Sequence, residues 1–172
     1  ALNNHQKGNF KKAEKFYNKI LKNFPDHFQS IFLLGTLFAQ VKNYKAAITL
    51  LKKAIHINPG YLDAYNNLGN IYREIESNQE AILYYQKIIK IDSSYIEAHN
   101  NLGKIYNEIG EHSEAISFFK TVIRLNPQHI EALNNLGVLF RQQGQLKEAT
   151  SYYRRALEID PEYIETLNNL GV

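Results

Sequence analysis

The sequence predicts an all-α fold, a solenoid of antiparallel helix pairs. One period of 34 residues runs through the 172-residue chain, giving about five units, and it holds every proline in a single phase. Within each period, apolar residues recur three and four positions apart, which is typical of one face of an α-helix. A single helical hairpin cannot bury such a wide apolar surface, so neighbouring units are expected to stack. The phased residues are Pro25, Pro59, Pro127 and Pro161, then Ala13, Ala47, Ala81, Ala115 and Ala149, and finally Gly35, Gly69, Gly103, Gly137 and Gly171.

Residues 62–95 illustrate how each unit is built. A turn at Glu76-Ser77-Asn78 should separate two helices, and its counterparts contain Gly8, Gly110 and Gly144, which favour a helix end. The unit closes at Asp92-Ser93, where three other units have Asn-Pro or Asp-Pro, and proline cannot continue a helix. Gly69 should let the neighbouring helix approach closely. The two apolar stripes are Tyr65, Leu68, Tyr72 and Ile75, and Ala81, Ile82, Tyr85, Ile88 and Ile89.

This pattern resembles the tetratricopeptide repeat (TPR) family, whose units run aromatic, Leu-Gly, aromatic, Ala-x-x-x-aromatic and Pro. The resemblance rests on Tyr65…Leu68-Gly69…Tyr72…Ala81…Tyr85 and its copies. It implies a right-handed superhelical solenoid whose first helices line a concave groove. The departures are the absence of tryptophan, His99 in an aromatic column, and Ser93 in place of proline. The expected units are a partial repeat in 1–27, complete repeats in 28–61, 62–95, 96–129 and 130–163, and the start of a further first helix in 164–172.

Composition limits the functional classes. The chain has no cysteine, which rules out disulfides, thiolate metal sites and cysteine nucleophiles. Twenty basic and seventeen acidic residues give a net charge of +3, too mild to favour nucleic acid as a partner. The most apolar stretch, Ile31–Ala39, is too short to span a membrane, so no membrane partner is expected and a cytoplasmic location is favoured. Because methionine is absent, Ala1 is not a translated start, and we expect a piece of a longer protein.

The sequence predicts no catalytic residue, no metal ligand, no cofactor and therefore no enzyme. It contains no phosphate-binding loop, dinucleotide fingerprint, His-Glu-x-x-His motif or nucleophile elbow. Its histidines lack ligand spacing; His27 and His129 share one inter-repeat phase, so structural or surface roles are expected. The aromatic residues fall at helical spacing and predict a core rather than a base-stacking surface. These core columns are Phe38, Tyr72, Tyr106 and Phe140, and Tyr17, Tyr85, Phe119 and Tyr153.

The polar side of each first helix carries the functional prediction. Asparagine recurs there although it is a mediocre helix former, and its carboxamide can both donate to and accept from a peptide backbone. An acidic row beside it should favour basic or neutral ligands; its members are Asp63, Glu97, Glu131 and Glu165. The candidate peptide-binding groove residues are Asp63, Asn66, Asn67, Asn70, Arg73, Glu97, Asn100, Asn101, Lys104, Asn107, Glu131, Asn134, Asn135, Arg141, Asn168 and Asn169.

Two asparagine rows compete for two roles. The row at Asn67 is the stronger candidate for contacts between neighbouring helices, and the row at Asn66, with Asn100 and Asn134, for contacts with a peptide. The Asn67 row resembles the asparagine ladder that holds substrate polypeptide in the TPR superhelix of O-GlcNAc transferase, although Leu33 interrupts it. The groove does not resemble the carboxylate-clamp repeats of heat-shock co-chaperones, which present lysine and arginine to an acidic C-terminus.

These observations favour a non-catalytic scaffold that binds an extended peptide or protein segment in its groove. The alternatives are a substrate-recruiting arm of a larger enzyme, such as a glycosyltransferase, and a solenoid that self-associates end to end. Charge is uneven: residues 1–61 carry ten basic and two acidic side chains, and residues 62–172 carry ten and fifteen. The lysines of the opening helix share one face and are expected to be solvated or to attract an acidic partner: Lys11, Lys15, Lys19 and Lys22.

Overall fold

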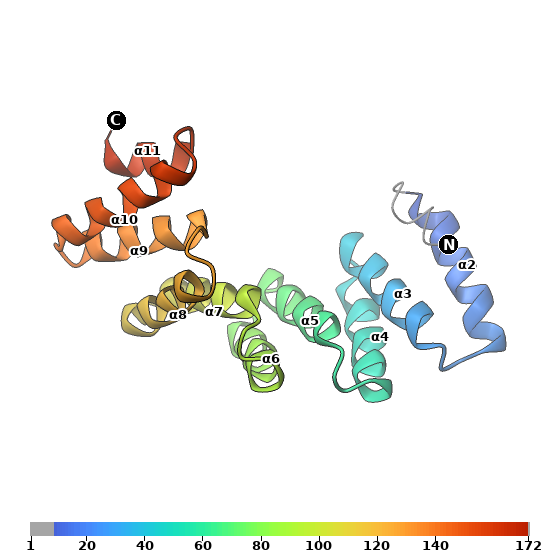
Figure 1. The fold of residues 1–172 in the computed structure, drawn as a ribbon. Coiled ribbons are helices and arrows are strands. Elements are labelled where there is room, and N and C mark those ends of the chain that lie inside the picture. The colour runs from blue at the N-terminus through green and yellow to red at the C-terminus, as the bar shows by residue number, and fades with distance from the viewer. Residues whose placement is uncertain (1–8, 172) are drawn as a thin grey trace. The chain divides into compact units, whose positions relative to one another are not determined.

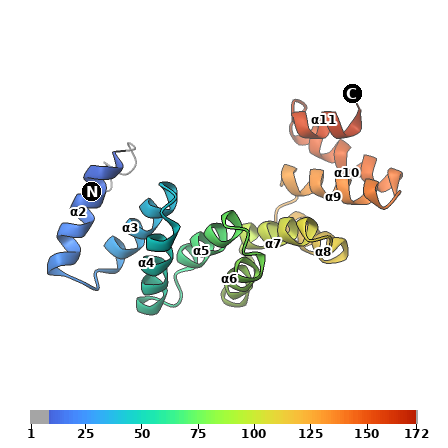
Figure 2. The same cartoon turned by 180° about the vertical axis from the view of Figure 1, so that it is seen from behind.

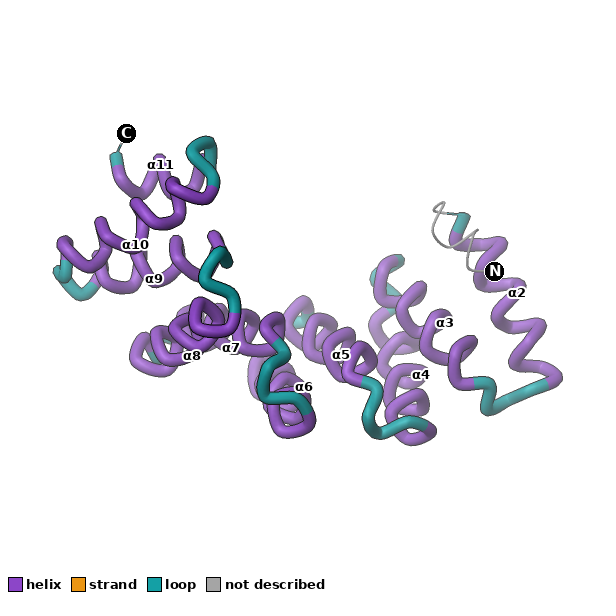
Figure 3. The backbone as a smooth tube through the Cα atoms, in the orientation of Figure 1, coloured by secondary structure: helices purple, strands orange, loops and turns teal. Residues whose placement is uncertain are grey.

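The computed structural model describes residues 9–171, and this part of the chain contains helices and loops but no strand (Figure 3). The all-α prediction is therefore confirmed. The chain divides into two compact units, Ala1–Ile91 and Asp92–Val172.

Unit 1 stacks helix pairs in chain order. The helix α3 packs against α4 and α5 against α6, while α2 contacts α3 and α4 contacts α5, so each pair is held to the next (Figures 1 and 2). The helices of unit 1 are α2 (Phe10–Asn23), α3 (Phe28–Gln40), α4 (Tyr44–Ile57), α5 (Leu62–Glu74) and α6 (Asn78–Ile91).

Unit 2 repeats the same arrangement. The pairs are α7 with α8 and α9 with α10; α8 contacts α9, and the short α11 packs on α10 and α9 (Figure 1). The helices of unit 2 are α7 (Ile96–Glu108), α8 (His112–Leu125), α9 (Ile130–Gln142), α10 (Leu146–Ile159) and α11 (Ile164–Leu170). The helical repeat solenoid expected from the sequence is thus present in both units.

The first helix of each pair ends at a residue in the left-handed conformation. Gly110 and Gly144 adopt φ angles of 85° and 76°, as their position in the period predicts. Lys42 and Glu76 adopt φ angles of 60° and 59° at the same phase, although they lack glycine's freedom. The fold imposes this turn even where a side chain costs about 1–2 kcal/mol. Gly8, the remaining glycine of this phase, lies outside the described residues.

Two histidines begin helices. Nδ1 of His27 accepts a hydrogen bond from the backbone N–H of Ser30 at 3.2 Å, and Nδ1 of His129 accepts one from Ala132 at 3.2 Å. The imidazole of His129 therefore satisfies an N–H group at the start of α9, and that of His27 adds a second acceptor to the Ser30 N–H, which also donates to the carbonyl of His27. Their shared phase reflects a shared structural role as N-caps of α3 and α9.

The glycines inside the first helices face large side chains of the second helices. A Cβ atom added at Gly69 would lie 2.7 Å from the ring of Tyr85, and one added at Gly137 would lie 2.3 Å from the ring of Tyr153. Both tyrosines are at most 2% exposed. The close approach predicted at Gly69 is therefore real, and it recurs along the chain. The remaining pairs are Gly35 with Leu51 and Gly103 with Phe119.

A third aromatic column, which the sequence argument did not single out, covers the outer edge of the core. Its rings stack nearly parallel on the first-helix aromatics, with centroids 5.4 Å apart in each of three pairs. Tyr72 and Tyr106 are only partly buried, whereas the column at Tyr85 is fully buried. The three stacked pairs are Tyr72 with Tyr84, Tyr106 with Phe118, and Phe140 with Tyr152.

His99 takes the place of the aromatic residue of the repeat and keeps that residue's hydrogen bond to a backbone carbonyl. The hydroxyl of Tyr65 donates to the carbonyl of Pro59 at 2.9 Å, and Nε2 of His99 lies 2.9 Å from the carbonyl of Ser93, six residues earlier in both cases. His99 is 7% exposed, so this bond is shielded from water. The two departures from the repeat pattern, His99 and Ser93, therefore meet in one contact.

Candidate functional site

A polar cleft of about 440 Å³ lies between α3 and α5 in unit 1. It is on the polar side of the first helices, where the sequence places its candidate residues Asn67 and Asn70. The cleft is lined by Thr36, Ala39, Gln40, Lys42, Tyr44, Asn67, Asn70, Ile71 and Glu74.

Asn67 ties α5 to α3 and leaves one half of its carboxamide unused. Its Nδ2 donates to Oγ1 of Thr36 at 3.0 Å, while the hydroxyl of Thr36 donates to the carbonyl of Phe32 at 3.0 Å. The Thr36 hydroxyl has one proton and donates it to the carbonyl of Phe32, so it can only accept a hydrogen bond from Asn67. This fixes the orientation of the Asn67 carboxamide. The Oδ1 atom of the half-buried Asn67 accepts no hydrogen bond from the described residues and remains an acceptor at the cleft.

Asn70 is fixed in the opposite sense. Its Oδ1 accepts a 2.6 Å hydrogen bond from the hydroxyl of Tyr85, which rises from the core of the same helix pair. The Nδ2 group of this exposed residue therefore keeps its protons for another acceptor. Asn67 and Asn70 are three residues apart and share one face of α5. The cleft thus offers one fixed acceptor and one fixed donor, the two groups that a peptide unit requires.

The charged residues of the cleft are Glu74 and Lys42. The Tyr44 hydroxyl lies 3.5 Å from Oε2 of Glu74, which is exposed. The cleft is therefore close to neutral overall, with its carboxylate on α5 and its ammonium group in the turn after α3.

The other candidates of unit 1 are less open or lie apart from the cleft lining. Asp63 is exposed at the start of α5; burial, together with the charge and hydrogen bond of this carboxylate, raises the pKa of Tyr61. Asn66 is half-buried, and its Oδ1 is buried without a hydrogen-bond partner among the described residues. Arg73 is half-buried and is engaged in a contact, so it is not a free cation.

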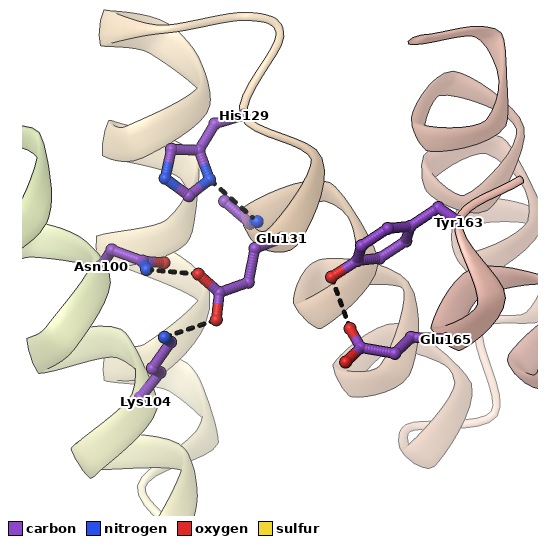
Figure 4. A network of polar contacts seen from close by, with 7 residues as sticks. Asn100, Lys104, His129, Glu131, Tyr163 and Glu165 are labelled. Atoms are coloured by element: carbon purple, nitrogen blue, oxygen red, sulfur yellow. Dashed lines mark hydrogen bonds and ion pairs between the residues drawn. The ribbon is translucent and has the colours of Figure 1, made fainter. Parts of the chain in front are cut away.

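In unit 2, Glu131 is the centre of a polar network between α7 and α9 (Figure 4). Its Oε2 accepts a 2.8 Å hydrogen bond from Nδ2 of Asn100, and its Oε1 forms an ion pair with Nζ of Lys104. Burial opposes the charge on Glu131, but the bonds from Lys104 and Asn100 outweigh burial and hold the pKa of this carboxyl below its usual value. This member of the acidic row is thus already neutralised by the protein.

Asn134 joins α9 to α11. Its Oδ1 accepts from Oγ1 of Thr166 and from Nδ2 of Asn169, both at 3.0 Å. Asn100 and Asn134 are each only 6% exposed. The Asn66 row was the stronger candidate for peptide contacts, but close stacking of the first helices leaves these two of its carboxamides little exposed. Asn67 and Asn169, of the other row, also bond to a neighbouring helix, as expected for that row.

The remaining candidates of unit 2 lie at or near the surface. Arg141 donates to the carbonyl of Asn169 at 2.8 Å and contacts its Oδ1 at 3.4 Å. Glu165 is exposed and accepts a hydrogen bond from the hydroxyl of Tyr163 (Figure 4). Glu97 and Asn168 are exposed, and Asn101, Asn107 and Asn135 are half-buried.

Only Asn67 and Asn70 of the cleft lining were among the candidates. The lining residues that were missed are Thr36, Ala39, Gln40, Lys42, Tyr44, Ile71 and Glu74. Thr36 and Gln40 precede Asn70 and Glu74 by one period, so extending the polar positions of α5 back by one repeat would have found them. Leu33, which interrupts the asparagine row, hid this correspondence.

Among residues 9–171, no three His, Asp or Glu side chains come together as metal ligands. No helix within the same residues is long and apolar enough to cross a membrane.

Known families match most of the chain. Models described as tetratricopeptide repeat match residues 95–162 and 1–27, and a model described as TPR repeat matches residues 35–74 and 69–110. No curated protein sequence matches the chain.

Solved structures match it along nearly its full length. A crystal structure of MamA shares 30% identity at a TM-score of 0.85, covering 93% of this chain and 94% of that one. YrrB, a TPR protein with an unusual peptide-binding site, shares 22% identity at a TM-score of 0.81, covering 98% and 87%. PilF of Pseudomonas aeruginosa shares 21% identity at a TM-score of 0.84, covering 98% and 77%. The sequence period, the stacked helix pairs and these matches agree: the chain belongs to the tetratricopeptide repeat family.

Proposed function

We propose that this chain is a non-catalytic scaffold for protein interaction, and that its unit 1 cleft binds an extended peptide segment by its main chain. The observation that carries the proposal is the pair of fixed groups on α5. Asn67 presents an acceptor and Asn70 a donor to one cleft, each oriented by a hydrogen bond to the protein. Such preorganised groups lose little entropy when a ligand binds.

The chemistry of the cleft favours recognition of the backbone over recognition of one side chain. A peptide N–H donating to Asn67 and a peptide C=O accepting from Asn70 would each add about 0.5–1.5 kcal/mol net. The cleft holds one cation and one anion, so a neutral segment fits it without leaving a buried charge unpaired. YrrB, which shares only the fold at 22% identity, is an example of this fold presenting a peptide-binding site.

The test compares two kinds of variant. One kind removes the carboxamide of Asn67 or Asn70, and the other removes the protein group that is hydrogen-bonded to that carboxamide. Asn67→Ala removes the acceptor, whereas Thr36→Val breaks the Asn67–Thr36 bond but keeps the carboxamide. Asn70→Ala and Tyr85→Phe form the second matched pair. Binding is measured by fluorescence anisotropy with peptides selected from a displayed library of unstructured segments.

We expect each Asn→Ala variant to weaken binding by about two- to tenfold, corresponding to one net hydrogen bond. Each matched control removes the bond that orients the carboxamide but keeps the carboxamide itself, so it should lose stability and lose less affinity than its Asn→Ala partner. If Thr36→Val and Tyr85→Phe lose as much affinity as their partners, the asparagines act only through the fold and the cleft assignment fails.

A further inference from the structure

We infer that Glu131 in unit 2 is a receptor for an arginine side chain, and that Lys104 occupies this receptor from within the protein. The inference extends the proposed function, because arginine would arrive on a bound segment, but it concerns a different unit and different residues. It would make Lys104 a determinant of which ligands bind.

Glu131 can be reached from outside. Its side chain is 39% exposed and that of Lys104 is 24% exposed, so the ion pair lies at the surface between α7 and α9. Asn100, which is itself 6% exposed, donates to the other carboxylate oxygen. One carboxylate oxygen is thus bound by a buried carboxamide and the other by a partly exposed lysine.

The network leaves one group unsatisfied. Oδ1 of Asn100 is buried and has no hydrogen-bond partner in the part of the chain that the structure describes. The ammonium group of Lys104 contacts Oε1 of Glu131 as a compact point charge. A guanidinium group carries five N–H donors in a planar fork, so it can pair with a carboxylate through two parallel bonds and keep donors for a further acceptor. The three donors of Lys104 leave this oxygen unpaired, whereas the wider planar fork of a guanidinium can span two neighbouring acceptors, so arginine is the better occupant.

The repeat itself does not need a cation at this position. The residues in the phase of Lys104 are Thr36, Asn70 and Val138, all uncharged, and their helices stack without an ion pair there. Elsewhere in the acidic row, Asp63 and Glu165 face the tyrosine hydroxyls of Tyr61 and Tyr163, which leave the carboxylate charge in place. Stacking of the repeats therefore does not require Lys104. Its removal leaves the carboxylate of Glu131 without a cation but still bonded to Asn100.

The experiment measures binding of N-acetyl-arginine amide, N-acetyl-lysine amide and the neutral N-acetyl-citrulline amide by NMR chemical-shift titration of the α7 and α9 amides. The proteins are the wild type, Lys104→Met, and Lys104→Met with Glu131→Gln. Lys147→Met is the matched control, because it removes the same charge from an exposed site on α10. These probes do not require the unit 1 cleft, so failure here and failure of peptide binding at Asn67 and Asn70 are separate results.

We expect Lys104→Met to bind the arginine probe about three- to tenfold more tightly than the wild type, and more tightly than the lysine probe. The gain should be absent in the double variant, in Lys147→Met and with citrulline. An unchanged affinity in Lys104→Met, or a gain that persists without the Glu131 carboxylate, would overturn the inference.

A second variant keeps the test decisive if Lys104→Met folds poorly. Lys104→Arg places a guanidinium beside Glu131 within the chain. We expect it to fold at least as stably as the wild type and to bind the arginine probe more weakly, because the better occupant is then internal. Stronger binding of the probe to Lys104→Arg than to the wild type would contradict the proposed competition.

Discussion

Tyr85 and Tyr153 occupy the same place in their helix pairs but differ in one hydrogen bond. The hydroxyl of Tyr85 donates to Asn70, whereas the residue in the phase of Asn70 in the last complete pair is Val138. The hydroxyl of Tyr153 is consequently buried with no hydrogen-bond partner among the described residues. Burial raises the pKa of Tyr153, with the nearby charge of Arg141 opposing it, as expected for a phenol shielded from water.

This difference predicts opposite outcomes for the same substitution. Tyr85→Phe removes a satisfied hydrogen bond and should cost about 0.5–1.5 kcal/mol. Tyr153→Phe removes a buried hydroxyl that lacks a partner, whose burial costs about 1–3 kcal/mol, so it should be neutral or stabilising. Val138→Asn supplies a partner for Tyr153, and its coupling with Tyr153→Phe in a double-mutant cycle should be about 1 kcal/mol.

The assay is urea unfolding followed by circular dichroism, combined with hydrogen exchange of the α5–α6 and α9–α10 amides. Local exchange is needed because repeat arrays do not always unfold in one step. A change of 1 kcal/mol corresponds to a melting shift of about 2–4 °C at this chain length. If Tyr153→Phe destabilises its pair as much as Tyr85→Phe does, and if Val138→Asn shows no coupling, the hydrogen-bond argument is refuted.

Three further predictions concern packing and charge. Gly137→Ala raises helix propensity but should destabilise α9–α10 by about 1–3 kcal/mol, because its Cβ meets the ring of Tyr153. Adding Tyr153→Leu should recover part of this loss, since a leucine in the same place opposite Gly35 leaves a Cβ 3.0 Å of room instead of 2.3 Å; thermal unfolding of the double variant tests this. His99→Phe should lose about 1 kcal/mol by deleting the contact with Ser93, whereas His99→Tyr should keep stability, measured by urea unfolding. The folded-state pKa of Glu131 is lowered, so its contribution to the free energy of unfolding is present above the unfolded pKa of about 4.3 and is lost as pH falls through the folded value. Glu131→Gln should remove this loss of stability at low pH, measured as melting temperature over a pH series. The same fall in melting temperature at low pH in the variant and the wild type would contradict it.

Much of the fold could be predicted from the sequence because the period carries it. The phased glycines mark where second-helix rings approach, and the Tyr85 column is buried as expected. The outer column at Tyr84 was missed although it also recurs with the period, because the apolar stripe was drawn from the inner face of the helix alone. The left-handed backbone of Lys42 and Glu76 could not be predicted from residue type, since neither side chain favours the end of a helix.

The site was predictable in outline but not in accessibility. Helical periodicity places Asn66 and Asn67 on the same polar arc, yet their exposure depends on how closely the next first helix stacks. Asn134 and Thr166 are 32 residues apart in the sequence, and their hydrogen bond depends on how closely α9 and α11 stack. The orientation of a carboxamide depends on whether its partner donates or accepts. Thr36 accepts from Asn67 because its own proton is donated to the carbonyl of Phe32. These are tertiary facts with no signal in composition or period.

The structural and the binding roles of the recurring asparagines need not exclude one another. A carboxamide has two polar ends, and one end suffices to tie a helix to its neighbour. Asn67 and Asn70 each use one end on the protein and leave the complementary end at the cleft, whereas Asn134 receives two internal donors at its Oδ1. Recurrence of asparagine therefore does not identify the residues that contact a ligand; the end left over by the internal bonds does. By that criterion we propose the side of unit 1 between α3 and α5 as the surface for a peptide backbone, while in unit 2 Glu131 is already paired with Lys104.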